Sequence, residues 1–312
     1  MRKIAFLFPG QGAQAVGMGH DFYQEFDHVR EIFDMAEEIT RLNLSRLCFN
    51  GPMEDLTMTS NLQPAVTAVN LAILAAIEKE GIGCDIVAGH SLGEYSALSA
   101  SGTLTREDTV DLVLKRGNLM HRESTKYEGA LSAIIGLPIN IVEQLVAEGQ
   151  KEGVVAVGNH NSELQIAITG APGPVSNVSE KAVALGAKAI PIKVSGAWHS
   201  ELIKGAEEEL NACLNSASFN PPDIPIILNV TAEMTADSDE IRNVMSRQLC
   251  SPVKWYDTMG RLMKEEIEVF AEIGPGKVLT GLLKRTVPED YSHQCFTVNT
   301  IEGFEKFHRA MT

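Results

Sequence analysis

The sequence predicts an α/β protein, with a large α/β-hydrolase-like domain around a parallel sheet and an inserted, small ferredoxin-like subdomain. Three observations predict this. Short apolar runs alternate with longer helical segments, which favours a parallel sheet covered on both faces. The middle of the chain instead has the order βαββαβ. A serine between two glycines follows one apolar run, as at a strand-to-helix turn.

The larger domain is expected to span residues 1–126 and 196–312. Its strands are predicted over 4–8, 85–89, 226–230 and 267–273, and its clearest helices over 61–80 and 105–121. Thr105 and Asp108 form a capping-box pattern at the start of the second helix.

The smaller subdomain is expected to span residues 127–195. ALSAIIGL predicts a strand over 130–137, and Pro138 begins a helix that runs to about Ala147. The remaining elements are strands 154–161 and 164–170, a helix over 175–185 and a strand over 187–194. A cleft between the two domains is the expected binding site.

Composition bounds the possible functions. The chain has 312 residues, 44% of them hydrophobic, and a formal net charge of −15, which argues against binding to nucleic acid or to anionic membranes. The first apolar run stops at Pro9, too early for a signal peptide or a membrane span. The five cysteines are scattered without a Cys-x-x-Cys pair, so no metal site is expected. We expect a soluble, cytoplasmic enzyme.

Ser91, in GHSLG, is the first candidate catalytic residue. A nucleophile elbow exposes its serine in a tight turn, and the following N–H, from Leu92, can bind an oxyanion. An ordinary glycine-bounded turn is the alternative. A serine needs a base to take its proton. Of the eight histidines, His199 is the leading candidate, because it lies where the inserted domain returns to the larger one. His160 also stays open for a role in the cleft.

The loop FPGQGAQ and Arg116 add to this site. The loop lacks the G-x-G-x-x-G spacing and the lysine of a phosphate-binding loop, so its glycines favour a backbone oxyanion donor, with Gln11 supplying the N–H. Arg116 lies on the apolar face of helix 105–121, where a guanidinium needs an anion. That anion is either a core carboxylate or a substrate carboxylate held by the arginine fork.

The motifs FPGQGAQ, GHSLGE, LKRGNLM, GAWHS, RQLCSPVKW and EIGPGKVL occur together and in this order. On these motifs the chain resembles malonyl-CoA:acyl carrier protein transacylases and the related acyltransferase domains of polyketide synthases. The resemblance covers nearly the whole chain.

The resemblance implies a role for each matching residue. Ser91 would take the malonyl group, His199 would act as base and then acid, and Gln248 would orient His199 through its main-chain carbonyl. Gln11 and Leu92 would form the oxyanion hole. The implied substrate-binding residues are Arg116, which would pair with the malonyl carboxylate, and Gln11, Met120, Asn159, Asn161 and Trp198.

The implied reaction is ping-pong. Malonyl-CoA would acylate Ser91, and the phosphopantetheine thiol of holo-acyl carrier protein would then take the malonyl group, supplying fatty acid synthesis. Coenzyme A would be a substrate carrier, with no tightly bound cofactor. Three alternatives stay open: a hydrolase, a polyketide or malonate decarboxylase relative with the same chemistry, and a catalytically silent docking protein.

Two local features depart from the pattern of the family, and a third concerns docking of the carrier protein. Trp198 stands where malonyl-selective relatives usually have Phe, so we expect methylmalonyl-CoA to be excluded at least as strongly. Glu163-Leu164-Gln165 replaces the common Pro-Gly-Gln of relatives. Lys277, Lys284 and Arg285 lie at helical spacing, which indicates a solvated helix end, with carrier-protein docking as the alternative.

Overall fold

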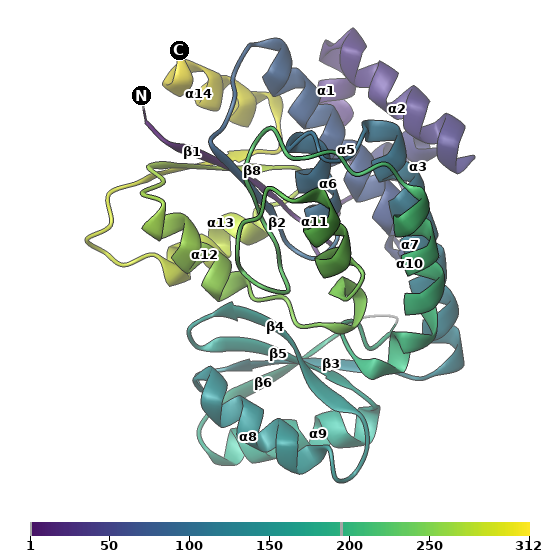
Figure 1. The fold of residues 1–312 in the computed structure, drawn as a ribbon, viewed down its shortest axis with the longest axis vertical. Helices are drawn as coiled ribbons and strands as arrows, with labels where there is room; N and C mark the ends of the chain where they lie inside the picture. The colour runs from purple at the N-terminus through teal and green to yellow at the C-terminus, as the bar shows by residue number, and fades with distance from the viewer. Residues whose placement is uncertain (1, 194–195) are drawn as a thin grey trace.

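The computed structural model describes residues 2–193 and 196–312 and contains two separate sheets. In Figure 1 the larger sheet lies among helices at the top, and the smaller sheet lies below it with α8 and α9 on its outer side. The inner side of the smaller sheet faces the larger unit, where β4 contacts α12 and α13. The predicted α/β class with a parallel sheet is confirmed.

The larger sheet has five parallel strands in the order β7-β2-β1-β8-β9. Their bounds are β1 (Ile4–Phe8), β2 (Ile86–Gly89), β7 (Ile226–Ile227), β8 (Val269–Ile273) and β9 (Gln294–Val298). The prediction of a strand over 226–230 was too long, because the chain turns back after Ile227 and Leu228 N–H donates to Glu233 O. The edge strand β9 was not predicted; it is only partly buried and carries a weak apolar pattern.

Helices cover both faces of this sheet. Their bounds are α1 (His20–Glu25), α2 (Asp27–Thr40), α3 (Leu44–Asn50), α4 (Met53–Thr57), α5 (Thr59–Lys79), α6 (Gly93–Ala100), α7 (Arg106–Lys126), α10 (Glu207–Ser216), α11 (Ser238–Met245), α12 (Trp255–Lys264), α13 (Val278–Thr286) and α14 (Ile301–Met311). Two 3₁₀ turns, η1 (Glu201–Ala206) and η2 (Gln248–Cys250), lie beside the cleft.

Helix α5 is the central helix of the core. Its length and hydropathy would suit a membrane span, but 89% of its most apolar window is buried inside the protein. It packs most extensively against α7 and α2. Its Asn70 donates hydrogen bonds to Pro9 O and to Ser96 Oγ, both at 3.1 Å, so that α5 fixes the loop after β1 to α6.

Helix α7 begins where the sequence predicts and ends later. The Thr105 side chain accepts from Asp108 N–H, as the capping box requires. The helix continues to Lys126, five residues past the predicted end, so His121 lies within it and does not close it.

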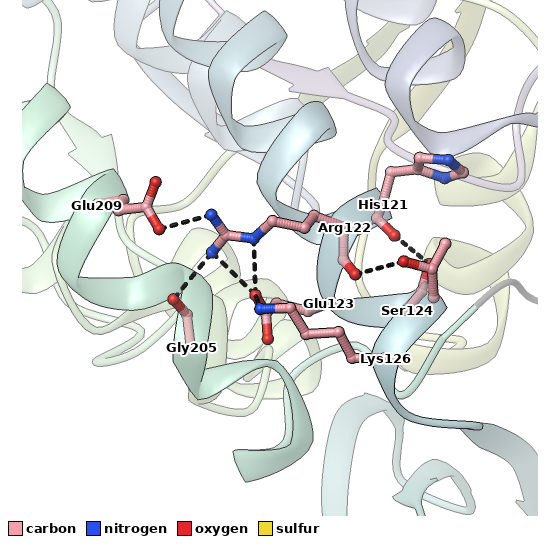
Figure 2. A network of polar contacts seen from close by, with 8 residues as sticks. His121, Arg122, Glu123, Ser124, Lys126, Gly205 and Glu209 are labelled. Carbon is pink, nitrogen blue, oxygen red and sulfur yellow. Dashed lines mark hydrogen bonds and ion pairs between the residues drawn. The ribbon is translucent and has the colours of Figure 1, made fainter.

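The last turn of α7 is joined to η1 and α10 by a polar network (Figure 2). Glu123, 2% exposed, accepts from Arg122 Nε at 2.9 Å and from Lys126 Nζ at 2.8 Å. Arg122 also donates to Glu209 Oε1 at 2.6 Å and to Gly205 O at 3.1 Å. The network therefore ties the helix that carries Arg116 to the segment that follows His199.

The smaller sheet has four antiparallel strands in the order β4-β5-β3-β6. Its elements follow the predicted order βαββαβ: β3 (Ala130–Ile135), α8 (Ile139–Gly149), β4 (Val155–Ser162), β5 (Gln165–Gly170), α9 (Pro172–Ala184) and β6 (Lys188–Ile192). The helix predicted from 175 begins at Pro172, a proline suited to a first helical turn. The predicted strand 187–194 ends earlier than expected, and Val194, with Ser195 after it, lies outside the described residues.

The chain leaves and re-enters the larger unit at neighbouring points. A Cβ on Gly129 would lie 2.2 Å from Ala197 N, so the outgoing and returning segments touch there through bare backbone. Trp198 and His199 follow this contact directly. This contact between the two segments therefore places Trp198 and His199 at the edge of the cleft.

Candidate active site

The turn between β2 and α6 has the geometry of a nucleophile elbow. Ser91 has φ 51°, in the left-handed region. A Cβ on Gly89 would lie 2.0 Å from Gly93 O, and one on Gly93 would lie 2.0 Å from Phe8 O. Any side chain at either glycine would clash with backbone, so both positions of the GHSLG motif require glycine.

Ser91 meets His199 across the cleft. Ser91 Oγ lies 2.8 Å from His199 Nε2, and the other ring nitrogen, Nδ1, lies 3.1 Å from Gln248 O and 2.9 Å from Ser251 O. Because both partners of Nδ1 are carbonyl acceptors, Nδ1 carries the proton and Nε2 is free to accept one from the serine. Main-chain carbonyls thus orient the ring, as the resemblance implies for Gln248. Ser251 is a second orienting residue that the sequence did not indicate.

His199 is neutral in this environment. Burial lowers the pKa of His199 to about 3, and the positive charge of Arg116 and the neighbouring His90 add to the effect. The carbonyls of Gln248 and Ser251 act in the opposite direction. A neutral imidazole beside Ser91 Oγ can accept the hydroxyl proton across the whole pH range in which proteins normally work.

Gln11 and Leu92 line the same cavity as Ser91. Across residues 2–193 and 196–312, neither main-chain N–H donates to a protein acceptor. The loop that carries Gln11 is pressed against the elbow, since a Cβ on Gly10 would lie 2.4 Å from His90 O. An oxyanion hole requires two donors of this kind, without protein acceptors and close to the nucleophile.

Arg116 is buried, with 1% of its surface exposed, and its guanidinium points at Ser91. Nη1 donates to Gln63 Oε1 at 2.9 Å, and Nη2 donates to Gln248 Oε1 at 3.2 Å and to Ser91 Oγ at 3.3 Å. In the described part of the chain no carboxylate forms an ion pair with it, so the alternative of a direct structural salt bridge was wrong. Burial lowers the pKa of Arg116.

The guanidinium also lies 5.5 Å from the centre of the Tyr95 ring, in a cation–π contact. Gln63, which the sequence analysis missed, donates from Nε2 to Met120 Sδ at 3.0 Å. The same amide therefore fixes both Arg116 and Met120, one turn apart on α7.

A cavity of about 290 Å³ contains these groups. Nine of the ten residues predicted for the site line it: Gln11, Ser91, Leu92, Arg116, Met120, Asn159, Asn161, Trp198 and His199. Asn159 and Asn161 come from β4 of the smaller sheet, and Asn161 Oδ1 lies 2.9 Å from His90 Nε2. The tenth, Gln248, is 1% exposed and lies behind Ser91 and Arg116.

Two polar residues behind the elbow were also missed. Asn229 Oδ1 accepts from Ser91 N–H at 2.7 Å, and its Nδ2 donates to Gly89 O at 2.6 Å. Glu94 is fully buried and accepts from Asn229 N–H and Gln248 Nε2, both at 2.7 Å. Burial raises the pKa of Glu94 to about 7, against these hydrogen bonds and the charge of Arg116. An acid within GHSLGE, just after an apolar strand, was the available signal for Glu94.

The basic residues in and beside α13 are exposed, and one of them contacts the smaller sheet. Lys277 precedes the helix, Lys284 and Arg285 lie in its last turn, and Arg285 Nη1 donates to Gln165 Oε1 of β5. Glu163 and Leu164 form the turn between β4 and β5, ahead of Gln165. Carrier-protein docking at α13 stays a prediction. In the described part of the chain no group of three or more His, Cys, Asp or Glu could hold a metal ion.

Comparison with known proteins agrees with this geometry. Residues 5–307 match the family described as acyl transferase domain. Malonyl CoA-acyl carrier protein transacylase of Bacillus subtilis (strain 168) is 43% identical over 91% of this chain and 90% of its own, and that of Haemophilus influenzae is 38% identical over 97% of each.

Solved structures agree as well. An acyl carrier protein S-malonyltransferase from Vibrio cholerae superposes with a TM-score of 0.93 at 37% identity, covering 98% of this chain and 99% of that one. A malonyl-transacylase in complex with its type II polyketide acyl carrier protein superposes with a TM-score of 0.94 at 33% identity, covering 99% of each chain. The chain is therefore an acyltransferase that belongs to the acyl transferase domain family, and its resemblance to the malonyl-CoA:acyl carrier protein transacylases is confirmed.

Proposed function

We propose that this enzyme transfers the malonyl group of malonyl-CoA to the phosphopantetheine thiol of holo-acyl carrier protein, by a ping-pong mechanism through a malonyl ester of Ser91. The observation that carries the proposal is Arg116, a buried guanidinium that lies 3.3 Å from Ser91 Oγ and contacts no carboxylate among the residues that the structure describes. An acyl group on Ser91 would place its own carboxylate beside Arg116. The names of the relatives support the same substrate and acceptor.

In the first half-reaction His199 Nε2 takes the proton of Ser91 Oγ as this oxygen attacks the thioester carbonyl. The oxyanion that forms accepts hydrogen bonds from the N–H groups of Gln11 and Leu92. The carbon–sulfur bond then breaks, and the coenzyme A thiolate leaves with the proton from His199. Ser91 is left as a malonyl ester.

The second half-reaction reverses these steps with a different thiol. The phosphopantetheine thiol gives its proton to His199, and its sulfur attacks the ester carbonyl. The same two N–H groups stabilise the oxyanion. The bond to Ser91 Oγ breaks, and His199 returns the proton to the serine. No carboxylate is needed to orient His199, because Gln248 O and Ser251 O already accept from Nδ1–H.

Selectivity follows from the surroundings of the acyl group. Removing one partner of a buried ion pair costs about 3–5 kcal/mol, so a neutral acyl group beside Arg116 is held poorly. Met120 and Trp198 are among the apolar residues that line the cavity. Asn159 and Asn161 contribute polar groups to the cleft from the smaller unit.

The division of the chain belongs to this proposal. We place one unit at residues 1–126 and 196–312 and the other at 127–195, which puts the cleft between them. The β7-β2-β1-β8-β9 order with its serine elbow supports an α/β-hydrolase-like unit, and the antiparallel β4-β5-β3-β6 order supports a ferredoxin-like one. We place the enzyme in the cytoplasm, in fatty acid synthesis, with coenzyme A thioesters as substrates and no tightly bound cofactor.

Intact-mass measurement tests the proposal. The protein is mixed briefly with equal amounts of malonyl-, methylmalonyl- and acetyl-CoA, with Ser91→Ala as the control. The expected result is a malonyl adduct on the wild type alone, discharged by holo-acyl carrier protein. Free malonate without an adduct would make the protein a hydrolase, and neither adduct nor malonate would reject the role of Ser91.

A further inference from the structure

Glu94 is a buried carboxylate that holds two polar residues and contacts no cation in the described part of the chain. Its side chain is 0% exposed. Oε1 accepts from Asn229 N–H at 2.7 Å, and Oε2 accepts from Gln248 Nε2 at 2.7 Å. A carboxylate in this position costs desolvation energy, so its presence needs a reason beyond packing.

Both residues that Glu94 holds also hold Ser91. Asn229 Oδ1 accepts from Ser91 N–H at 2.7 Å, and Gln248 Nε2 donates to Ser91 O at 2.9 Å. The left-handed backbone of Ser91 is thus fixed on both sides, by its own N–H and by its own carbonyl. Glu94 is the common anchor of these two contacts.

Gln248 also connects Glu94 to Arg116. Its Oε1 accepts from Arg116 Nη2 at 3.2 Å while its Nε2 donates to Glu94. A single amide therefore separates the buried carboxylate from the buried guanidinium. The line Glu94–Gln248–Arg116 ends at Ser91 Oγ, where the acyl group of the substrate would be attached.

Burial shifts the pKa of three other titratable groups near the site towards the neutral form. On α6, burial raises the pKa of Tyr95 to about 12. At the elbow, burial lowers the pKa of His90, and across the cleft it lowers the pKa of His199 to about 3. Within residues 2–193 and 196–312, Arg116 of α7 is thus the charged group that faces Glu94.

We propose that Glu94 is a positioning residue that acts as the counter-charge of Arg116 while the acyl pocket holds no anion, and that it takes up a proton from solvent when a carboxylate-bearing acyl group pairs with Arg116. The inference rests on the proposed function. Two carboxylates around one guanidinium in a buried site would leave one negative charge unpaired, and protonation of Glu94 removes it. The raised pKa of Glu94, about 7, makes this protonation accessible near neutral pH.

The consequence is a selectivity that depends on pH. Below the pKa of Glu94 the neutral acid leaves Arg116 without a counter-charge, which favours malonyl. Above it, the ionised Glu94 competes for Arg116. A nearby like charge shifts a carboxyl pKa by about one unit, so by linkage the malonyl-to-acetyl ratio of kcat/KM for acylation should fall about tenfold from pH 6 to pH 9. Titration of the coenzyme A phosphates cancels in this ratio.

Three variants test the role of the carboxylate. Glu94→Gln imitates the protonated acid, and its ratio should not change with pH. Glu94→Asp keeps a titrating group and should keep the dependence. The matched control is Glu272→Gln, which removes another buried carboxylate, one that accepts from Leu279 N–H at 2.9 Å and Thr280 N–H at 2.7 Å. The malonyl-to-acetyl ratio of Glu272→Gln should change with pH as it does in the wild type. If the loss of any buried acid were enough, the ratio would be independent of pH in both Glu94→Gln and Glu272→Gln.

A direct measurement needs no variant. In weakly buffered solution at pH 8, with an indicator dye, formation of the malonyl adduct should take up a fraction of a proton per adduct, and formation of the acetyl adduct should take up none. A ratio that does not vary with pH in the wild type, equal proton uptake, or a persistent pH dependence in Glu94→Gln would each overturn the proposal. If Ser91 forms no malonyl adduct at all, the proposed function itself fails.

Discussion

Ser91 and His199 meet with both of their backbones in the left-handed region. Their φ angles are 51° and 60°, and Ser91 Oγ lies 2.8 Å from His199 Nε2. Residues with a Cβ adopt this conformation at a cost of about 1–2 kcal/mol each, and they keep it only where neighbouring contacts enforce it. The two side chains that we propose to react therefore lie on strained backbone.

The strain at Ser91 predicts that two substitutions with the same effect on activity differ in their effect on stability. Ser91→Gly and Ser91→Ala both lose the Oγ contacts with His199 and Arg116, and both should lose the acyl adduct. Only glycine relieves the left-handed backbone. We expect Ser91→Gly to be more stable than Ser91→Ala by about 1 kcal/mol in the free energy of unfolding, measured by urea denaturation. Equal stabilities would mean that the turn is not strained.

Arg116 should control the basicity of His199. Burial is the largest cause of the lowered pKa of His199, and the positive charge of Arg116 is the next. We expect Arg116→Gln to raise the pKa of His199 from about 3 towards its ordinary value, followed by NMR titration of the imidazole.

The control for this prediction is the adjacent Lys115→Gln. Lys115 is half-exposed and pairs with Asp111 at 2.6 Å on the solvent side of α7, so its removal should leave the pKa of His199 unchanged. If Arg116→Gln also leaves it unchanged, burial alone sets the basicity of His199.

The sequence predicts the parts of this protein that follow local rules. The alternation of apolar runs predicted β1, β2 and β8, and the capping box predicted where α7 begins. The glycines of GHSLG predicted the elbow, because close backbone approach leaves no room for a Cβ. Elements that rely on distant contacts were harder to predict. The strand β9 is a partly buried edge strand, and β7 is shorter than predicted because the chain turns back to Met234.

The residues of the candidate site also fall into those that local sequence predicts and those that depend on distant contacts. Nine of the residues that line the cavity could be predicted, most of them from short motifs, whereas Gln63, Glu94, Asn229 and Ser251 act from behind them. Asn229 lies 138 positions after Ser91 in the sequence, and only the fold brings its amide to the Ser91 N–H. Gln63 comes from α5, whose apolar pattern indicates nothing but burial. Their roles depend on pairing across elements, which a single sequence does not contain.

Within the polar network at the end of α7, Glu123 should contribute more to stability than Glu209. Glu123 is 2% exposed and takes hydrogen bonds from Arg122 and Lys126, whereas the Glu209 side chain is 59% exposed (Figure 2). We expect Glu123→Gln to lower the free energy of unfolding by about 1–3 kcal/mol. The matched change Glu209→Gln should cost less than about 0.5 kcal/mol, because exposed ion pairs contribute little. Thermal and urea unfolding measure both, and equal losses would contradict the assignment.

Trp198 should limit the size of the acyl group. Its ring is 6% exposed, lines the cavity, and lies against the backbone of Gly196, where a Cβ would be 2.8 Å from the ring. Within the described residues its Nε1–H has no hydrogen-bond partner, so replacement by Phe removes volume without breaking a polar contact.

We expect Trp198→Phe to raise the rate of acylation by methylmalonyl-CoA relative to malonyl-CoA by about tenfold, within the range that one methyl group contributes to discrimination in an apolar pocket. Intact-mass competition between the two thioesters measures the ratio. Selectivity against acetyl-CoA depends on Arg116 and should not change in the same variant, which separates a change of pocket volume from a general loss of activity. Comparable acylation of the wild type by the two thioesters would show that Trp198 does not crowd the carbon next to the thioester.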